Sequence, residues 1–166
     1  KGLLTHSLGH RWWAPLYEQL GIGISDIDNI YSREQWKKML GLLKEESPED
    51  SEKYIYSDID FLFLGAILRA HFGRGLEEDF EDWKHNWGLD SSFFCIGNRC
   101  PVSLDLVAPT EYSEYRSRRM HGQVHDVNTF FLGGVSSHAG LFSTLDDLSA
   151  WVLRLRQERL GNGKLD

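Results

Sequence analysis

The stretch that most constrains how this chain folds is Phe131–Leu148, where closely spaced glycines precede a helix start. Glycine tolerates positive φ and the close approach of another backbone. Gly133-Gly134 and Gly140 therefore predict a loop that turns tightly past a neighbouring segment. The dipeptide Ser143-Thr144 is typical of a helix N-cap. The sequence thus predicts a structured loop followed by a helix over Leu145–Leu160.

Size and charge set the class of protein. The 166 residues correspond to one domain, and we treat residues 1–166 as a single domain segment. A net charge of −7 argues against nucleic acid or an anionic membrane as the partner. No apolar run approaches the length that a membrane span needs. Because the chain opens on Lys1 rather than on methionine, the absence of a signal-peptide pattern says little about its compartment.

A first helix is predicted to begin at Ser32. Gln35 follows three residues later, which is a capping-box pattern. Apolar residues then recur at helical spacing and form one stripe: Trp36, Met39, Leu40 and Leu43.

A second helix is predicted from Ser57 to Phe72. Ser57 and Asp60 repeat the capping pattern, and Gly73 is a typical helix stop. Because the residues between them are apolar nearly all round, we expect this helix to be buried.

The remaining chain is predicted to be mostly irregular. A third helix is expected over Leu76–Trp87, with an acidic first turn that suits the helix dipole. Residues 88–135 are expected to be mostly loop with short extended pieces. The chain is therefore predicted to be mainly α with long loops and little strand.

The two cysteines, Cys95 and Cys100, are separated by Ile-Gly-Asn-Arg. A short-loop disulfide and two unpaired small side chains are both compatible with this spacing, since sequence does not show whether the Cβ vectors converge.

Four residues suggest a metal site: His121, His125, Asp126 and His138. Two histidines four residues apart on a helix can bind zinc. Gly122 weakens a helix at this point, so we favour hydrogen bonding of His125 and Asp126 within the loop, and we expect no metal.

Tyr56 immediately precedes the second predicted helix. A tyrosine at a helix entry is usually an anchor. To act as a general base it would need the helix dipole and a neighbouring cation to stabilise its phenolate.

Three segments carry a family resemblance. Residues 122–144 contain Gly-Gln-Val-His-Asp-Val-Asn and then Leu-Gly-Gly-Val-Ser-Ser-His-Ala-Gly-Leu-Phe-Ser-Thr. Residues 56–65 read Tyr-Ser-Asp-Ile-Asp-Phe-Leu-Phe-Leu-Gly, and residues 3–9 read Leu-Leu-Thr-His-Ser-Leu-Gly. In this order they resemble the β-lactamase-like, penicillin-recognising serine hydrolases. That family includes class C β-lactamases, D-alanyl-D-alanine carboxypeptidases and esterases.

The resemblance implies the α/β serine β-lactamase/transpeptidase-like fold, an antiparallel sheet flanked by helices with a helical subdomain beside it. This chain would be the helical subdomain and active-site flank. The implied activity is hydrolysis of an amide or ester through an acyl-enzyme, without a cofactor. The implied substrate is a small molecule or a peptidoglycan-like peptide, and the implied location is outside the cytoplasm of a bacterium, periplasmic or secreted. The oligomeric state stays open.

The resemblance also assigns roles to residues. Tyr56 would be the catalytic base, and Asp58 stands where the family more often has Asn. A carboxylate only accepts hydrogen bonds, whereas an amide also donates, so Asp58 leaves room for a substrate other than a penicillin-like amide. The remaining substrate-binding residues would lie in the glycine loop and just before it: His125, Asp126, Ser137 and His138.

The chain departs from the family in one respect. No serine is followed three residues later by lysine, so the family's S-x-x-K nucleophile element is missing, and the late K-T-G strand element is missing as well. Ser7 beside His6 is better explained as part of a structural turn, because adjacent residues seldom face each other productively. We therefore expect an internal segment of a longer hydrolase. The alternatives are a catalytically inactive binding or regulatory module and, less favoured, a histidine-based metal-dependent hydrolase.

Overall fold

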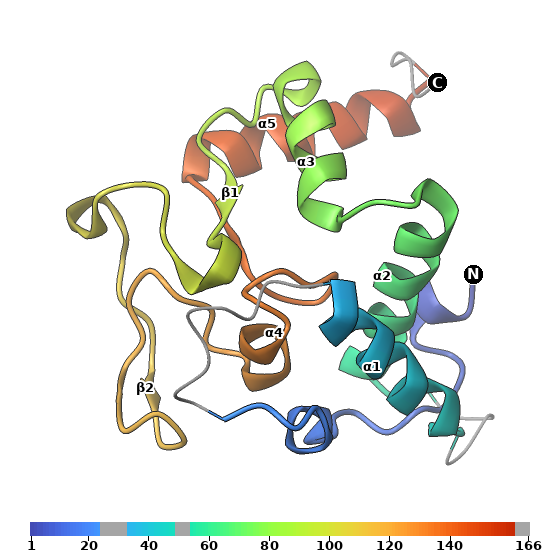
Figure 1. The fold of residues 1–166 in the computed structure, drawn as a ribbon. Coiled ribbons are helices and arrows are strands. Elements are labelled where there is room, and N and C mark those ends of the chain that lie inside the picture. The colour runs from blue at the N-terminus through green and yellow to red at the C-terminus, as the bar shows by residue number, and fades with distance from the viewer. Residues whose placement is uncertain (24–32, 49–53, 162–166) are drawn as a thin grey trace.

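The computed structural model describes residues 1–23, 33–48 and 54–161. The predicted helix start at Ser32 lies outside these ranges. Figure 1 shows a mainly helical arrangement, with α3 and α5 at one end and α1, α2 and α4 at the other. The helices are α1 (Arg33–Glu45), α2 (Asp58–Phe72), α3 (Leu76–Lys84), α4 (Val127–Phe131) and α5 (Leu145–Arg159).

Strand structure is confined to two short antiparallel pairs among the described residues. β1 (Phe93–Phe94) pairs with β4 (Leu141–Phe142), so Phe93 faces Phe142 and their rings stack. β2 (Tyr112–Ser113) pairs with β3 (Arg118–Arg119). The prediction of a mainly α chain with long loops and little strand is confirmed. No described helix is long and apolar enough to cross a bilayer.

The core lies between α1, α2, α4 and the N-terminal segment. The stripe predicted on α1 is confirmed, since Trp36, Met39 and Leu43 are buried and Leu40 is partly buried. The apolar residues that they join in one cluster include Leu16, Leu20, Ile59, Leu62, Phe130, Phe131 and Val135.

Helix α2 begins and ends where the sequence predicts. The Ser57 hydroxyl accepts a hydrogen bond from the Asp60 amide, and Gly73 ends the helix at φ +71°. The prediction that α2 is buried all round is wrong for its C-terminal half, because Ile67, Leu68 and Phe72 are exposed. The residues that pack against α1 and the N-terminal segment share one face, so the opposite face stays open.

Two further predictions are met in part. The predicted helix 76–87 is α3 followed by a 3₁₀ turn at His85–Trp87, which Gly88 ends at φ +69°. The region 88–135 is mostly loop, but it contains α4, which the sequence did not indicate. Asp126 caps this short helix by accepting a hydrogen bond from the Thr129 amide.

The predicted last helix is confirmed as α5 with Thr144 as its N-cap.

A buried carboxylate fastens the N-terminal segment to α2. Asp60 is fully buried, and its Oδ1 lies 2.6 Å from His10 Nδ1. Because a carboxylate only accepts, the imidazole nitrogen is the donor. His6 Nδ1 lies 3.2 Å from Asp60 Oδ2 and 3.1 Å from the Ser57 amide, which donates to it. The N-terminal segment and the start of α2 therefore meet at one buried carboxylate.

We predict that Asp60→Ala destabilises the protein by about 3–5 kcal/mol, because it removes the acceptor of the buried His10 and the carboxylate against which His6 lies. Chemical denaturation measures this loss. The matched control is Asp90→Ala, which breaks an exposed pair with His85 and should change stability by less than about 0.5 kcal/mol. Equal effects of the two variants would contradict the structural role of Asp60.

The glycine loop turns as tightly as its sequence predicts. Gly133, Gly134 and Gly140 have φ of +82°, +88° and +106°. A β-carbon at Gly134 would collide with the Cys95 carbonyl oxygen, and the Gly97 amide donates to the Gly133 carbonyl at 2.8 Å. The loop is thus held against the 95–98 turn by backbone contact.

We predict that Gly134→Ala costs more than about 1 kcal/mol, because a side chain there meets both positive φ and a fixed carbonyl. Gly41→Ala is the control, since Gly41 lies within α1 with open space around it and alanine favours a helix by roughly 0.5–1 kcal/mol. Thermal unfolding of both variants should therefore show shifts of opposite sign. A Gly134→Ala variant as stable as the parent would show that the loop is unstrained.

Candidate functional site

Tyr56 lies at the entry to α2 and is open to solvent. Its side chain is 61% exposed, and its ring lies 4.7 Å from that of His6, centroid to centroid. The Asp58 amide donates to the Trp12 carbonyl at 2.9 Å, so the backbone at the helix entry is fixed against the N-terminal segment. The phenol oxygen is thus presented on a rigid backbone and is accessible to a reactant.

Three of the predicted site residues come together. Asp58, Asp126 and His138 each place one oxygen or nitrogen atom within 4.8 Å of the others. They come from the first turn of α2, the cap of α4 and the glycine loop, segments far apart in sequence. Asp58 is half-buried, whereas the His138 side chain is only 4% exposed. The structure therefore assembles a charged cluster at the start of α2.

Hydrogen bonds fix the orientation of two members of this cluster. His138 Nε2 lies 3.0 Å from Asp126 Oδ1, and His138 Nδ1 lies 2.8 Å from Ser136 Oγ. Asp126 Oδ1 also accepts from the Thr129 amide at 2.6 Å. The expected hydrogen bonding of Asp126 within the loop is confirmed.

The two carboxyl groups of the cluster titrate in opposite directions. Burial raises the pKa of Asp126, but hydrogen bonds from His138 and Thr129 outweigh it and leave that pKa below its ordinary value. Burial, aided by the charge of Asp126, raises the pKa of Asp58, with His138 and His6 acting against it. The ionised form is therefore stabilised at Asp126 and destabilised at Asp58.

The other predicted residues lie around this cluster without joining it. Ser137 donates to the Phe61 carbonyl and packs against Gly65 of α2. The His125 side chain is exposed, while its carbonyl accepts from Arg116. His121 Nε2 lies 2.9 Å from the Leu104 carbonyl. The pattern His121–His125–Asp126–His138 is therefore wrong as a metal site, because its first two histidines point elsewhere.

Ser7 and His6 do not form a catalytic pair. Ser7 Oγ lies 3.0 Å from Thr5 Oγ1, whereas His6 faces Asp60 and the Ser57 amide. The structural explanation of this segment agrees with these contacts.

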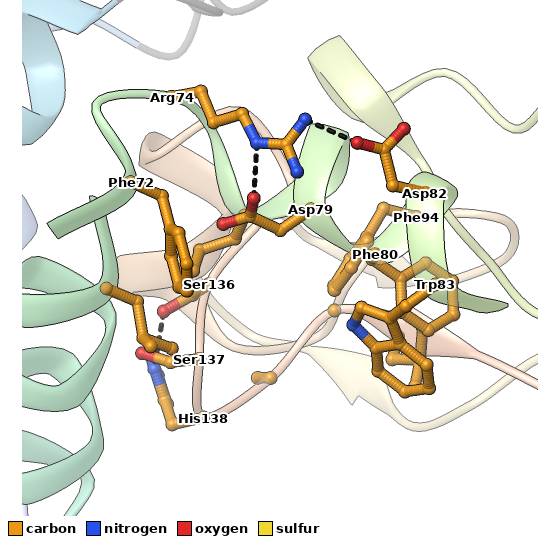
Figure 2. Close-up of a pocket in the computed structure, with 15 residues that line it drawn as sticks. Phe72, Arg74, Asp79, Phe80, Asp82, Trp83, Phe94, Ser136, Ser137 and His138 are labelled. Carbon is orange, nitrogen blue, oxygen red and sulfur yellow. Dashed lines mark hydrogen bonds and ion pairs between the residues drawn. The ribbon is translucent and has the colours of Figure 1, made fainter. Parts of the chain in front are cut away.

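A cavity of about 770 Å³ is lined in part by the glycine loop, including His138. Figure 2 shows Arg74 at the cavity, where it reaches toward Asp79 and Asp82. Ser136 and His138 lie on a separate part of the cavity wall. Its wall is largely aromatic and comes from α2, α3 and β1: Phe72, Phe80, Trp83 and Phe94. The sequence analysis missed Ser136, whose only signal is its position two residues before His138.

Cys95 and Cys100 are free thiols in the structure. Burial raises the pKa of the Cys95 thiol, and a hydrogen bond with Cys100 raises it further. Of the two alternatives that the spacing left open, the structure has unpaired side chains.

We predict that Asp58→Asn stabilises the protein at pH 7. The buffer should contain a chelator, so that no bound cation offsets the charge of the Asp58 carboxylate. The folded state binds the Asp58 proton more tightly than the unfolded state, so the ionised carboxylate costs stability above its folded pKa. The gain should shrink as pH falls and disappear below about 4, where the wild-type carboxyl becomes protonated in both states. Melting temperatures from about pH 3 to pH 8 measure it.

The control for this titration is Asp146→Asn. Asp146 also lies in the first turn of a helix, α5, but it is exposed. Its replacement removes the same helix-dipole contribution without relieving burial. A pH-dependent gain of the same size in both variants would show that burial of Asp58 is not the cause.

Comparison with known proteins gives relatives but no fold match. No family model and no solved structure matches the chain. The chain is 32% identical over 127 residues to a protein of Escherichia coli strain K12 named "Putative D-alanyl-D-alanine carboxypeptidase", covering 69% of this chain and 28% of that protein. It is 32% identical over 136 residues to an N-acetylmuramyl-L-alanine amidase of Bacillus subtilis strain 168, covering 72% and 30%.

A relative in Salmonella newport, with the same name as the Escherichia coli protein, is 31% identical over 130 residues, covering 70% of this chain and 30% of that protein. The chain thus spans less than a third of the length of these curated relatives. The similarity to proteins named D-alanyl-D-alanine carboxypeptidase agrees with the resemblance seen in the sequence.

Proposed function

We propose that this chain is the base-bearing part of a β-lactamase-like serine hydrolase that cleaves an alanine-linked amide of peptidoglycan through an acyl-enzyme. The observation that carries the proposal is the similarity of about 70% of the chain to relatives named for two such bonds. D-alanyl-D-alanine and N-acetylmuramyl-L-alanine linkages both place an alanine at an amide of the cell-wall peptide. A substrate outside the cytoplasmic membrane would place the enzyme in the periplasm or outside the cell.

Tyr56 is the proposed general base. Its side chain is exposed and lies just before α2, at the positive end of the helix dipole. In the proposed reaction a serine hydroxyl attacks the amide carbonyl and passes its proton to the Tyr56 oxygen. The tyrosine then protonates the leaving amine, and water releases the acyl group by the reverse sequence. The chain has no Ser-x-x-Lys, so the proposal assigns the nucleophile to a segment outside these residues.

The remaining predicted residues are proposed to shape the substrate side of the cleft. Asp58 lies two residues after Tyr56 and is half-buried, which suits a contact to a polar group of the substrate. Asp126, Ser137 and His138 hold the loop that faces it. His125 is exposed beside a separate cavity of about 360 Å³ and is proposed to contact a more distant part of the peptide.

The test is Tyr56→Phe in the complete protein that carries this chain. The substitution keeps the ring that lies against His6 and removes only the ionisable oxygen. We expect acylation by a D-alanyl-D-alanine peptide or a penicillin to slow by roughly 10²–10⁴-fold while the melting temperature is unchanged.

Tyr54→Phe is the matched control, because Tyr54 is a second exposed tyrosine that contacts His6 edge-on. Its acylation rate should equal that of the wild type. Unchanged acylation in Tyr56→Phe would reject Tyr56 as the base. A complete protein that binds these peptides without acylation would instead be the binding module considered above.

A further inference from the structure

We propose that Asp58, Asp126 and His138 form a binding site for a divalent transition-metal ion, with zinc as its first candidate. The proposal does not rest on the proposed hydrolase activity. It replaces the histidine pattern that the sequence suggested with a different set of ligands, of which only Asp126 and His138 are shared.

The geometry of the cluster fits coordination. All three potential ligand atoms lie within 4.8 Å of one another, and His138 Nε2 lies 3.0 Å from Asp126 Oδ1. Ligand atoms about 2.0–2.2 Å from a tetrahedral zinc ion lie roughly 3.4 Å from each other. The His138–Asp126 pair is close to this spacing, and Asp58 would move toward the pair when an ion binds. Imidazole and carboxylate together suit zinc better than calcium or magnesium, which prefer oxygen alone.

The surroundings orient two of the ligands in advance. The Nδ1 of His138 contacts Ser136 Oγ at 2.8 Å, which directs Nε2 toward the carboxylates. Without an ion, Nε2 faces the Asp126 carboxylate, which only accepts, so Nε2 carries the proton. Zinc binding would move that proton to Nδ1, which would then donate to the Ser136 hydroxyl and leave the Nε2 lone pair for the ion. Metal-binding histidines usually have such a partner on their second nitrogen. Asp126 is held in turn by the Thr129 amide.

Charge favours a cation at this place. Two ionised carboxylates and a neutral imidazole carry a combined charge of −2, and the two carboxylates lie close enough to repel each other. A divalent ion would remove that repulsion. Because Asp58 is only half-buried, solvent reaches the cluster and water can complete the coordination, as it does at sites with three protein ligands.

Other histidine–carboxylate groups among the described residues fit a metal less well. His6 Nδ1 accepts from the Ser57 amide and is already engaged beside Asp60. His85 and Asp90 form an exposed pair without a third ligand. The Asp58–Asp126–His138 cluster is thus the one that combines three ligands with a fixed orientation.

The test is zinc binding by the purified protein, measured by calorimetric titration after chelator treatment, with cobalt absorption as a second readout. We expect one zinc ion per chain. Asp58→Asn and His138→Gln should each weaken zinc binding by at least about 10-fold, and Ser136→Ala, which removes only the partner of His138, should weaken it by about 10-fold.

The matched control is His85→Gln, which removes an exposed histidine that also faces a carboxylate and should leave zinc affinity unchanged. Asp58 lies at a half-exposed helix start, so Asp58→Asn keeps the proposal testable if His138→Gln does not fold. The proposal is overturned if the wild type binds no zinc, or if folded Asp58→Asn binds zinc as tightly as the wild type. A loss of binding in His85→Gln would also overturn it by placing the ion on the surface.

Discussion

The carboxylate of Asp60 is the interaction on which the candidate site depends. It is fully buried and has His6 and His10 as partners, so the N-terminal segment is fixed across the start of α2. The Trp12 carbonyl then receives the Asp58 amide, and the His6 ring lies beside Tyr56. A carboxylate buried at this depth without a partner is costly, so loss of these contacts would destabilise the start of α2.

Helix α2 joins the two halves of the site. Its first turn supplies Asp58, and its middle is close enough to the glycine loop for Ser137 to donate to the Phe61 carbonyl. This approach requires Gly65, because a β-carbon there would overlap Ser137. The same loop is held from behind by the 95–98 turn. His138 is therefore brought to Asp58 by contacts of the glycine loop with α2 on one side and with the 95–98 turn on the other.

Features set by neighbouring residues could be predicted from the sequence, and features set by distant ones could not. The caps at Ser57 and Thr144 and the stop at Gly73 follow from local hydrogen bonding and φ preference. Asp60 was interpreted as a capping residue, yet its side chain turns to histidines about fifty residues away in sequence. His6 Nδ1 takes the Ser57 amide in its place.

The same limit applies to the site and to burial. The resemblance named Asp58, Asp126 and His138 separately, but nothing in their spacing shows that they meet. Short α4 was missed because Asp126 has too few helical residues after it to form a periodic pattern. The exposure of Ile67 and Leu68 was missed because composition does not show which face of α2 finds a neighbour.

The loop contact at Gly134 also has a chemical consequence for the cysteine behind it. Alkylating reagents react with the thiolate form of cysteine. Cys95 is buried, and this burial raises the pKa of its thiol. Its carbonyl oxygen lies against Gly134, so we expect the thiol to become more reactive when the loop leaves the 95–98 turn. The alkylation rate of Cys95 would therefore measure how often the wall behind His138 opens in the native protein, without any added label.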